Sequence, residues 1–229
     1  MKHYLRAPLI ITGVVLAQWA LLTAGSANAK AAGTDQKGDS VQAARPRISR
    51  IPAQVRSFRT AKEAAISMRS FRPPEGRFPE TEIRTGGLAA ASADRMKGRL
   101  WMLAMKDGIS PDDFADAAFK GQAFSFGGTD TIRGATASAT IAVRKIELQG
   151  DEPGYAVFSI GIYKDDSLVA SDRKFLTASG TYSVTTTSVD LLPGAHYHVE
   201  AGLTILPRGS NGSRVIVSDA EVTEIRWSF

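Results

Sequence analysis

Residues 192–205 read Leu-Pro-Gly-Ala-His-Tyr-His-Val-Glu-Ala-Gly-Leu-Thr-Ile and contain the clearest strand pattern in the chain. After the Pro193-Gly194 turn, apolar residues occupy every second position from Tyr197 to Ile205. Successive side chains of a strand point to opposite faces of its sheet. The alternation therefore predicts a β-strand with one face against a hydrophobic core.

Similar runs lie on both sides of this stretch and share period-two alternation, β-branched residues and short turns between them. They lie near 122–126, 136–149, 155–163, 167–175, 181–189, 195–206 and 213–227. Runs at this spacing predict a mainly β protein, an antiparallel β-sandwich of jelly-roll or immunoglobulin-like type, over residues 122–229. At the level of the fold, the pattern is similar to many extracellular modules of these two types, a similarity that implies no function.

Details within these runs predict a hairpin and two strand irregularities. The segment Lys164-Asp165-Asp166 joins two runs, and aspartate tolerates the left-handed backbone that a tight turn needs. In the run 136–149 the apolar positions change phase after Val143, and in the run 213–227 they change phase after Val222. A bulge or a twist in each strand is the simplest explanation.

The preceding segment, residues 60–121, is predicted to be a helical cap on the sandwich. Thr60 and Glu63 have the spacing of a capping box before a short helix that ends near Ser70. Alanine-rich sequence with apolar residues three and four positions apart predicts a second helix over 88–106, and Ser-Pro-Asp-Asp predicts the start of a third over 110–119.

The first 29 residues have the pattern of a secretory signal peptide. Lys2 and Arg6 precede an apolar run from Leu9 to Leu22, and Ala27-Asn28-Ala29 resembles a cleavage site. Removal of this segment would leave no transmembrane span. We therefore expect a secreted or periplasmic protein, and the absence of cysteine favours a disulfide-free bacterial one.

Residues 30–59 are predicted to be a basic, flexible arm. From 41 to 72 the chain has seven arginines and one lysine against a single glutamate, whereas residues 73–229 are slightly acidic. The arm is either a solvated leader or a contact for an anionic surface. The arginines that would make this contact are Arg45, Arg47, Arg50, Arg56 and Arg59. The arm has no aromatic stacking pattern, which argues against nucleic acid as a partner.

Two histidines and a glutamate form the clearest cluster of potential metal ligands. His196, His198 and Glu200 are spaced by two residues, so a strand places all three on one face. Such a set could bind Zn²⁺ or another divalent ion and so form the centre of a hydrolase. The opposite face carries the core residues, so the alternative is that these three are simply the solvated side of the strand.

Two tyrosines are candidates for ligand contact. Tyr155 and Tyr163 share the face of their strand that is opposite to the predicted core residues. Exposed aromatic rings on a sheet can stack on sugars or anchor a protein partner. The helical cap could equally cover them.

No set of residues identifies a reaction or a catalytic residue. Our first hypothesis is therefore an exported, non-enzymatic β-sandwich that binds another protein or a glycan, or that has a structural role in the envelope or the extracellular space, with no cofactor. The alternative is a metal-dependent or other hydrolase centred on His196, His198 and Glu200.

Overall fold

The computed structural model describes residues 54–68, 70–71, 78–110, 113–152 and 154–229. These residues form one short helix and fourteen strands. In chain order the elements are β1 (Val55–Phe58), α2 (Ala61–Ser67), β2 (Ser70–Phe71), β3 (Glu80–Gly86), β4 (Leu88–Asp94), β5 (Arg99–Met105), β6 (Phe114–Lys120), β7 (Ala123–Phe126), β8 (Ile132–Gln149), β9 (Tyr155–Lys164), β10 (Ser167–Leu176), β11 (Gly180–Thr185), β12 (Val189–Leu191), β13 (Tyr197–Leu206) and β14 (Arg214–Ser228).

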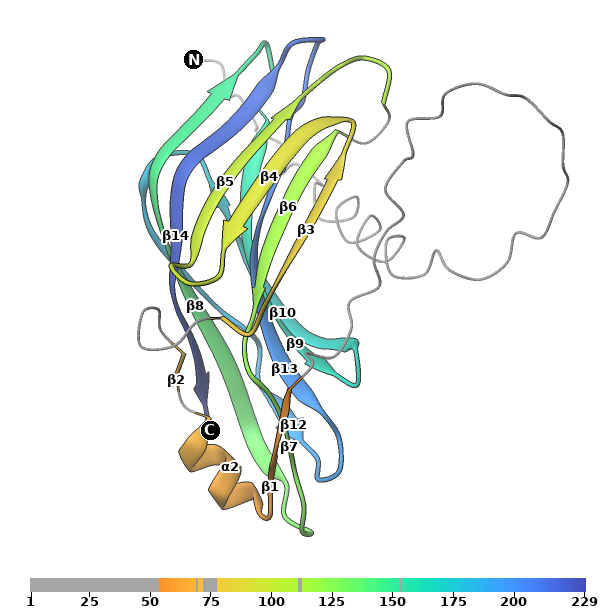
Figure 1. The fold of residues 1–229 in the computed structure, drawn as a ribbon, viewed down its shortest axis with the longest axis vertical. Helices are drawn as coiled ribbons and strands as arrows, with labels where there is room; N and C mark the ends of the chain where they lie inside the picture. Colours follow the sequence, from red (N-terminus) through yellow and green to blue (C-terminus); the bar gives the residue numbers. More distant parts are fainter. Residues whose placement is uncertain (1–53, 69, 72–77, 111–112, 153) are drawn as a thin grey trace, which may run out of the picture. The chain divides into compact units, whose positions relative to one another are not determined.

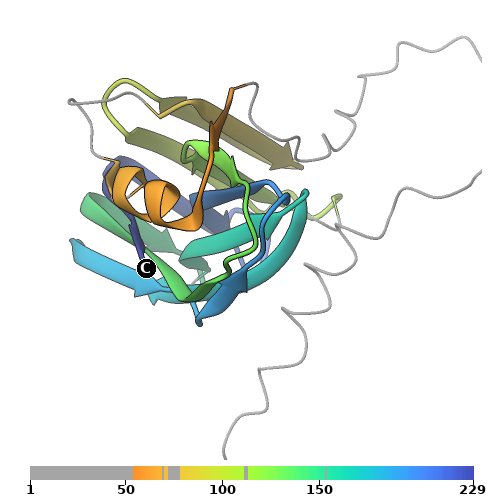
Figure 2. The same cartoon turned by 90° about the horizontal axis from the view of Figure 1, so that it is seen from below.

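The strands form two sheets of seven strands each, which face each other as a β-sandwich (Figures 1 and 2). In the first sheet β13 pairs with β9 on one edge and with β6 and β7 on the other; β10 extends the β9 side, and β3 and β1 extend the other. In the second sheet β14 pairs with β8 on one edge and with β5 and β2 on the other, and β11, β12 and β4 lie further out. All described pairings are antiparallel except that between β1 and β7. The predicted fold class is thus confirmed.

Six of the seven strands predicted after residue 121 are present with small shifts at their ends, whereas the predicted run 181–189 is divided between β11 and a separate short strand, β12. The predicted hairpin joins β9 to β10 through Asp165 and Asp166, which have φ angles of 45° and 66°. Both residues have the positive φ angles that a two-residue hairpin turn requires. The phase change after Val222 coincides with a register shift between β14 and β8, as predicted.

The predicted cap of α2 is also present. Thr60 Oγ1 accepts a hydrogen bond from the Glu63 backbone N–H at 3.2 Å. The Glu63 carboxylate turns back to accept from the Arg59 N–H at 3.0 Å, one residue before the expected partner. Ala61 and Ala64 are buried, so α2 packs its alanine face against the body of the protein.

The helices predicted over 88–106 and 110–119 are wrong, because these segments form β4, β5 and β6. In β5, Leu100, Met102 and Ala104 are buried and alternate with more exposed residues, so period two applies here as well. Alanine has the highest intrinsic helix propensity of the residues, but propensities are worth less than about 1 kcal/mol per residue, and burial between two sheets overrides them. Gly98, with φ +67°, makes the turn between β4 and β5, where a Cβ would collide with the Val222 carbonyl.

The predicted start of the β-sandwich and the predicted end of the flexible arm are also wrong, because further segments form strands. Strands β3 and β6 belong to the first sheet and β4 and β5 to the second, so the sandwich does not begin at residue 122. The end of the predicted flexible arm, residues 55–58, is β1 and pairs with β7. Arg56 and Arg59 are exposed there, while Arg45, Arg47, Arg50 and the predicted signal peptide lie outside the described residues.

Phe124 is the centre of an aromatic cluster at the end of the sandwich where α2 lies. Its ring centroid lies 6.1 Å from Tyr197, 5.4 Å from Trp227, 6.3 Å from Phe229 and 6.4 Å from Phe58. These rings come from both sheets and from residues far apart in the sequence. The cluster therefore joins the C-terminal strand to the rest of the core.

Replacing Phe124 with alanine is expected to lower the free energy of unfolding by about 3–5 kcal/mol, the usual cost of emptying a buried phenylalanine site. Urea denaturation measures this change. Ile109→Ala is the control, because Ile109 is 89% exposed and its removal should leave stability unchanged. A loss below about 1 kcal/mol for Phe124→Ala would contradict the packing described here.

Candidate functional site

The predicted polar face of β13 is buried, which corrects the expectation that it is solvated. His198 is 1% exposed and Glu200 is 8% exposed. His198 Nε2 lies 3.1 Å from Glu200 Oε1, and the His198 ring stacks on Tyr163 with centroids 5.0 Å apart. The side of the first sheet that faces away from the core therefore carries buried polar side chains, which include His198 and Glu200 and which we call the polar layer.

His196 does not join the other two predicted metal ligands. It precedes β13, and its ring Nδ1 lies 3.3 Å from Asp165 Oδ1 in the hairpin turn. Among the residues that the structure describes, no group of three or more His, Cys, Asp or Glu side chains is arranged to hold a metal ion. The three-ligand site predicted on this strand is therefore not formed.

Lys120 links the polar layer across the sheet. Its Nζ lies 3.4 Å from Glu200 Oε1 and 3.3 Å from Glu82 Oε2. Glu82 also pairs with Arg84 at 2.6 Å. Buried charges are tolerated when they are paired in this way, so the opposite charges on β3, β6 and β13 stabilise one another.

Asp116 lies in the same polar layer, and the pKa of its carboxyl group is raised above the usual value. Burial raises its pKa to about 6, and the nearby Glu82 and Glu200 carboxylates act in the same direction. A hydrogen bond from Thr204 Oγ1, 2.8 Å long, and the Arg84 guanidinium partly oppose this rise. Such a group is often functional, but ion-pair layers inside folds produce similar shifts.

The Asp116→Asn variant is expected to be more stable than the wild type at neutral pH. In the wild type the folded state keeps a proton that the unfolded state loses, so stability falls as pH rises from about 4 to about 6. Asparagine escapes this loss, and we expect a gain of about 3 kcal/mol above pH 6 that disappears below about pH 4.

Urea denaturation at several pH values measures this difference. Asp219→Asn is the matched control, because Asp219 lies at the surface of the other sheet. A difference between Asp116→Asn and wild type that is constant with pH would contradict a raised pKa at this position.

The two predicted ligand-contacting tyrosines lie at opposite ends of β9. Tyr163 is 7% exposed and stacks on His198, so its ring is covered rather than open to a ligand. Tyr155 is partly exposed, its ring meets Phe175 edge-to-face at 5.5 Å, and the Arg208 guanidinium lies over it at 4.9 Å. A ligand contact through Tyr155 stays a prediction.

A different aromatic residue, Trp101, lies open on the outer face of the second sheet. Its neighbours on β5, Leu100 and Met102, point into the core, which directs the indole outward with 39% of its surface exposed. On β4 the residue opposite to Trp101 is Ser92. Figure 1 shows β4, β5 and β14 side by side around this position.

A bulge in β14 brings polar groups to the other side of the indole. Val217 pairs with Met102 and Ala220 pairs with Leu100, so two residues, Ser218 and Asp219, oppose Trp101 alone. Bulges re-aim side chains in this way. Arg144 then fixes the carboxylates beside the bulge, with contacts of 3.0 Å to Asp219 and 2.9 Å to Glu221.

The turn between β4 and β5 closes the end of this surface. Asp94 accepts a hydrogen bond from the Met96 N–H at 2.9 Å, and Arg99 begins β5. The result is a cleft of about 340 Å³. We call it the Trp101 cleft. The residues that line it are Ser92, Asp94, Arg99, Leu100, Trp101, Ser218 and Asp219.

Sequence reasoning missed the Trp101 cleft because it predicted a helix over 88–106, the segment that contains Trp101. One signal was available: Gly98 interrupts the predicted helix and precedes a continuous apolar run, Leu100 to Met105, of the length of a buried strand. The bulge opposite Trp101 was not predicted. It lies between Val217 and Ala220, whereas the predicted irregularity in β14 follows Val222.

No family model and no curated protein matches this chain. Among solved structures, the chain is similar to the enzymatically active domain of tailspike protein 4 from bacteriophage CBA120, at 9% identity and a TM-score of 0.30, covering 62% of this chain and 19% of the tailspike chain. The carbohydrate-binding module TmCBM61, in complex with β-1,4-galactotriose, matches at 6% identity and a TM-score of 0.31, over 65% of this chain and 90% of the module.

A second binding module, CBM36 in complex with calcium and xylotriose, matches at 12% identity and a TM-score of 0.28, over 69% of this chain and 98% of the module. Similarities at these scores carry no argument about function. The fold assignment rests on the strand order given above. No helix in the described part of the chain is long and apolar enough to cross a membrane.

Proposed function

We propose that this protein is a carbohydrate-binding module whose ligand occupies the Trp101 cleft. The observation that carries the proposal is a partly exposed indole on the outer face of β5, the strand next to the sheet edge, with polar side chains on both sides. An aromatic face packs well against the C–H groups of a pyranose ring, which supplies most of the contact area at little entropic cost.

The rest of the lining matches the hydroxyl groups of a sugar. Five of the seven lining residues are polar, and they include carboxylates of Asp94 and Asp219 that accept hydrogen bonds and the Arg99 guanidinium that donates them. The cleft volume of about 340 Å³ lies at the small end of the range for ligand sites. Charges of both signs in the lining favour a neutral sugar, one or two residues of which would occupy the cleft.

The proposal is tested by affinity electrophoresis of the protein in gels that contain neutral polysaccharides, such as xylan, galactan, glucan and mannan. At least one polysaccharide is expected to retard the wild type. Trp101→Ala is expected to weaken the interaction by about tenfold or more, because it removes the stacking surface. Its unfolding midpoint should change little, since the indole is exposed.

Phe175→Ala is the matched control, because it removes an exposed aromatic ring from the other sheet, beside Tyr155. If Phe175→Ala abolishes retardation and Trp101→Ala does not, the sugar binds at the Tyr155 end of β9 and the Trp101 assignment is wrong. Absence of retardation by every polysaccharide tested would oppose the proposal as a whole. Release of reducing sugar from a bound polysaccharide would contradict a purely binding role.

We further propose that the chain is exported and cleaved after Ala29, as the pattern of its first residues suggests. Expression of the full sequence in a bacterial host and mass spectrometry of the product tests this. The expected product begins at Lys30 and is found outside the cytoplasm. An intact chain in the cytoplasmic fraction would contradict export.

A further inference from the structure

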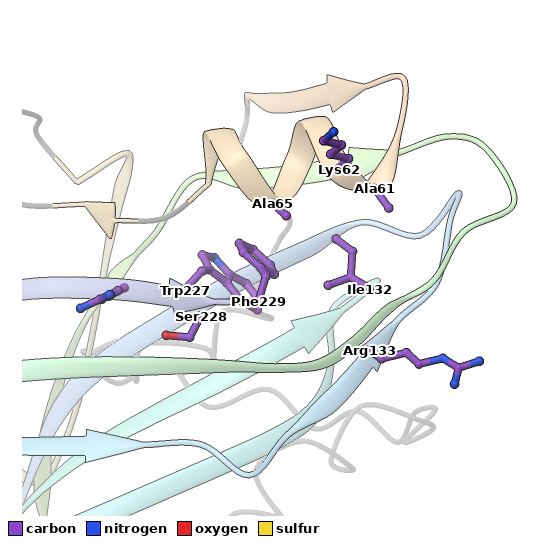
Figure 3. A pocket seen from close by; sticks show the side chains of 9 residues that line it. Ala61, Lys62, Ala65, Ile132, Arg133, Trp227, Ser228 and Phe229 are labelled. Atoms are coloured by element: carbon purple, nitrogen blue, oxygen red, sulfur yellow. The ribbon is translucent and has the colours of Figure 1, made fainter.

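A second cleft, of about 460 Å³, lies where α2 meets the ends of β8 and β14 (Figure 3). It is separate from the Trp101 cleft and shares no residue with it. We call it the α2 cleft. The residues that line it are Ala61, Lys62, Ala65, Ile132, Arg133, Arg226, Trp227, Ser228 and Phe229.

One wall of the α2 cleft is a fixed pair of aromatic rings. Trp227 and Phe229 stack with centroids 5.5 Å apart and an interplanar angle of 9°. Phe124 meets both rings edge-on, at interplanar angles of 86° and 89°. Because Phe124 holds both rings, the wall is preorganised for an apolar ligand and need not reorder on binding.

The opposite wall is formed by small side chains of α2. Figure 3 shows Ala65 above the rings and Ala61 above Ile132, which contributes a further apolar surface. An alanine side chain ends at Cβ, so the helix leaves space beside the rings, of which Phe229 is 37% exposed and Trp227 only 5%. A larger residue at position 65 would fill this space.

The mouth of the α2 cleft is positively charged. Lys62, Arg133 and Arg226 are all exposed, and none of them makes an ion pair with a residue that the structure describes. The residues that line this cleft include no carboxylate side chain. Figure 3 shows the Arg133 side chain beyond Ile132, extended into solvent and away from the two rings. The cations therefore remain available to an anion at the entrance.

We propose that the α2 cleft binds a small amphipathic carboxylate, with its apolar body between α2 and the two rings and its carboxylate at the mouth. The aromatic wall and the alanines supply an apolar surface, and long cationic side chains at the rim can close over a carboxylate. The charge complementarity distinguishes this site from the Trp101 cleft, whose lining mixes both signs.

Isothermal titration of the purified full-length chain with decanoate, and with decan-1-ol as its uncharged counterpart, tests the charge requirement. Decanoate is expected to bind one molecule per chain, at least about tenfold more tightly than decan-1-ol. The double substitution Arg133→Gln and Arg226→Gln is expected to weaken decanoate by about tenfold and to leave decan-1-ol unchanged. Equal binding of the two probes to the wild type would overturn the proposal.

The location is tested by filling the space. Ala65→Leu extends a side chain toward Trp227 and Phe229 and is expected to abolish decanoate binding while the protein stays folded by circular dichroism. In the Trp19→Phe, Trp101→Phe background, Trp227 is the only tryptophan, and its fluorescence is expected to change with decanoate. Retained binding in Ala65→Leu, or unchanged Trp227 emission on saturation, would place the ligand elsewhere and overturn the assignment.

This experiment is independent of the sugar proposal. Trp101→Ala is expected to lose polysaccharide binding, and Ala65→Leu is expected to lose only decanoate binding. Loss of decanoate affinity in Trp101→Ala would show that the ligand occupies the Trp101 cleft and would overturn the α2 site.

Discussion

The structure depends on β13, which is hydrogen-bonded to neighbours along both edges and is buried on both faces. Its entry is fixed as well: the Leu192 N–H donates to the Tyr197 hydroxyl at 2.8 Å, and the Gly194 N–H donates to the Phe126 carbonyl at 2.9 Å. A strand in this position leaves its polar side chains without free access to water. They must pair with groups on adjacent strands, because an unpaired buried charge costs several kcal/mol.

This constraint explains why the two outer faces differ. On the first sheet, His198 and Glu200 pair with each other, and Lys120 ties Glu200 to Glu82. The same side chains that looked like metal ligands are therefore used to satisfy one another. On the second sheet the outer face is less enclosed, so Trp101 stays open between polar neighbours.

Alanine side chains contribute both to the packing between the sheets and to the α2 cleft. Alternate alanines in β4, β6 and β8, such as Ala117 and Ala139, are buried or half-buried between the sheets. Small side chains allow the sheets to approach closely around large ones such as Phe158 and Met102. On α2, Ala61 and Ala65 instead leave space beside Trp227 and Phe229. The same residue type produces dense packing in one place and a cleft in another, according to what lies opposite.

The sequence by itself determined the strands from β7 onward except β12, the β9–β10 hairpin, the capped helix α2 and the inward face of β13. Each of these is encoded by local periodicity or turn chemistry. Only the tertiary structure decided that the alanine-rich segments form β4, β5 and β6, because both periodicities fit them and the choice rests on which surface they bury. It also decided that His198 is covered and Trp101 is open, since exposure depends on strands that are distant in the sequence.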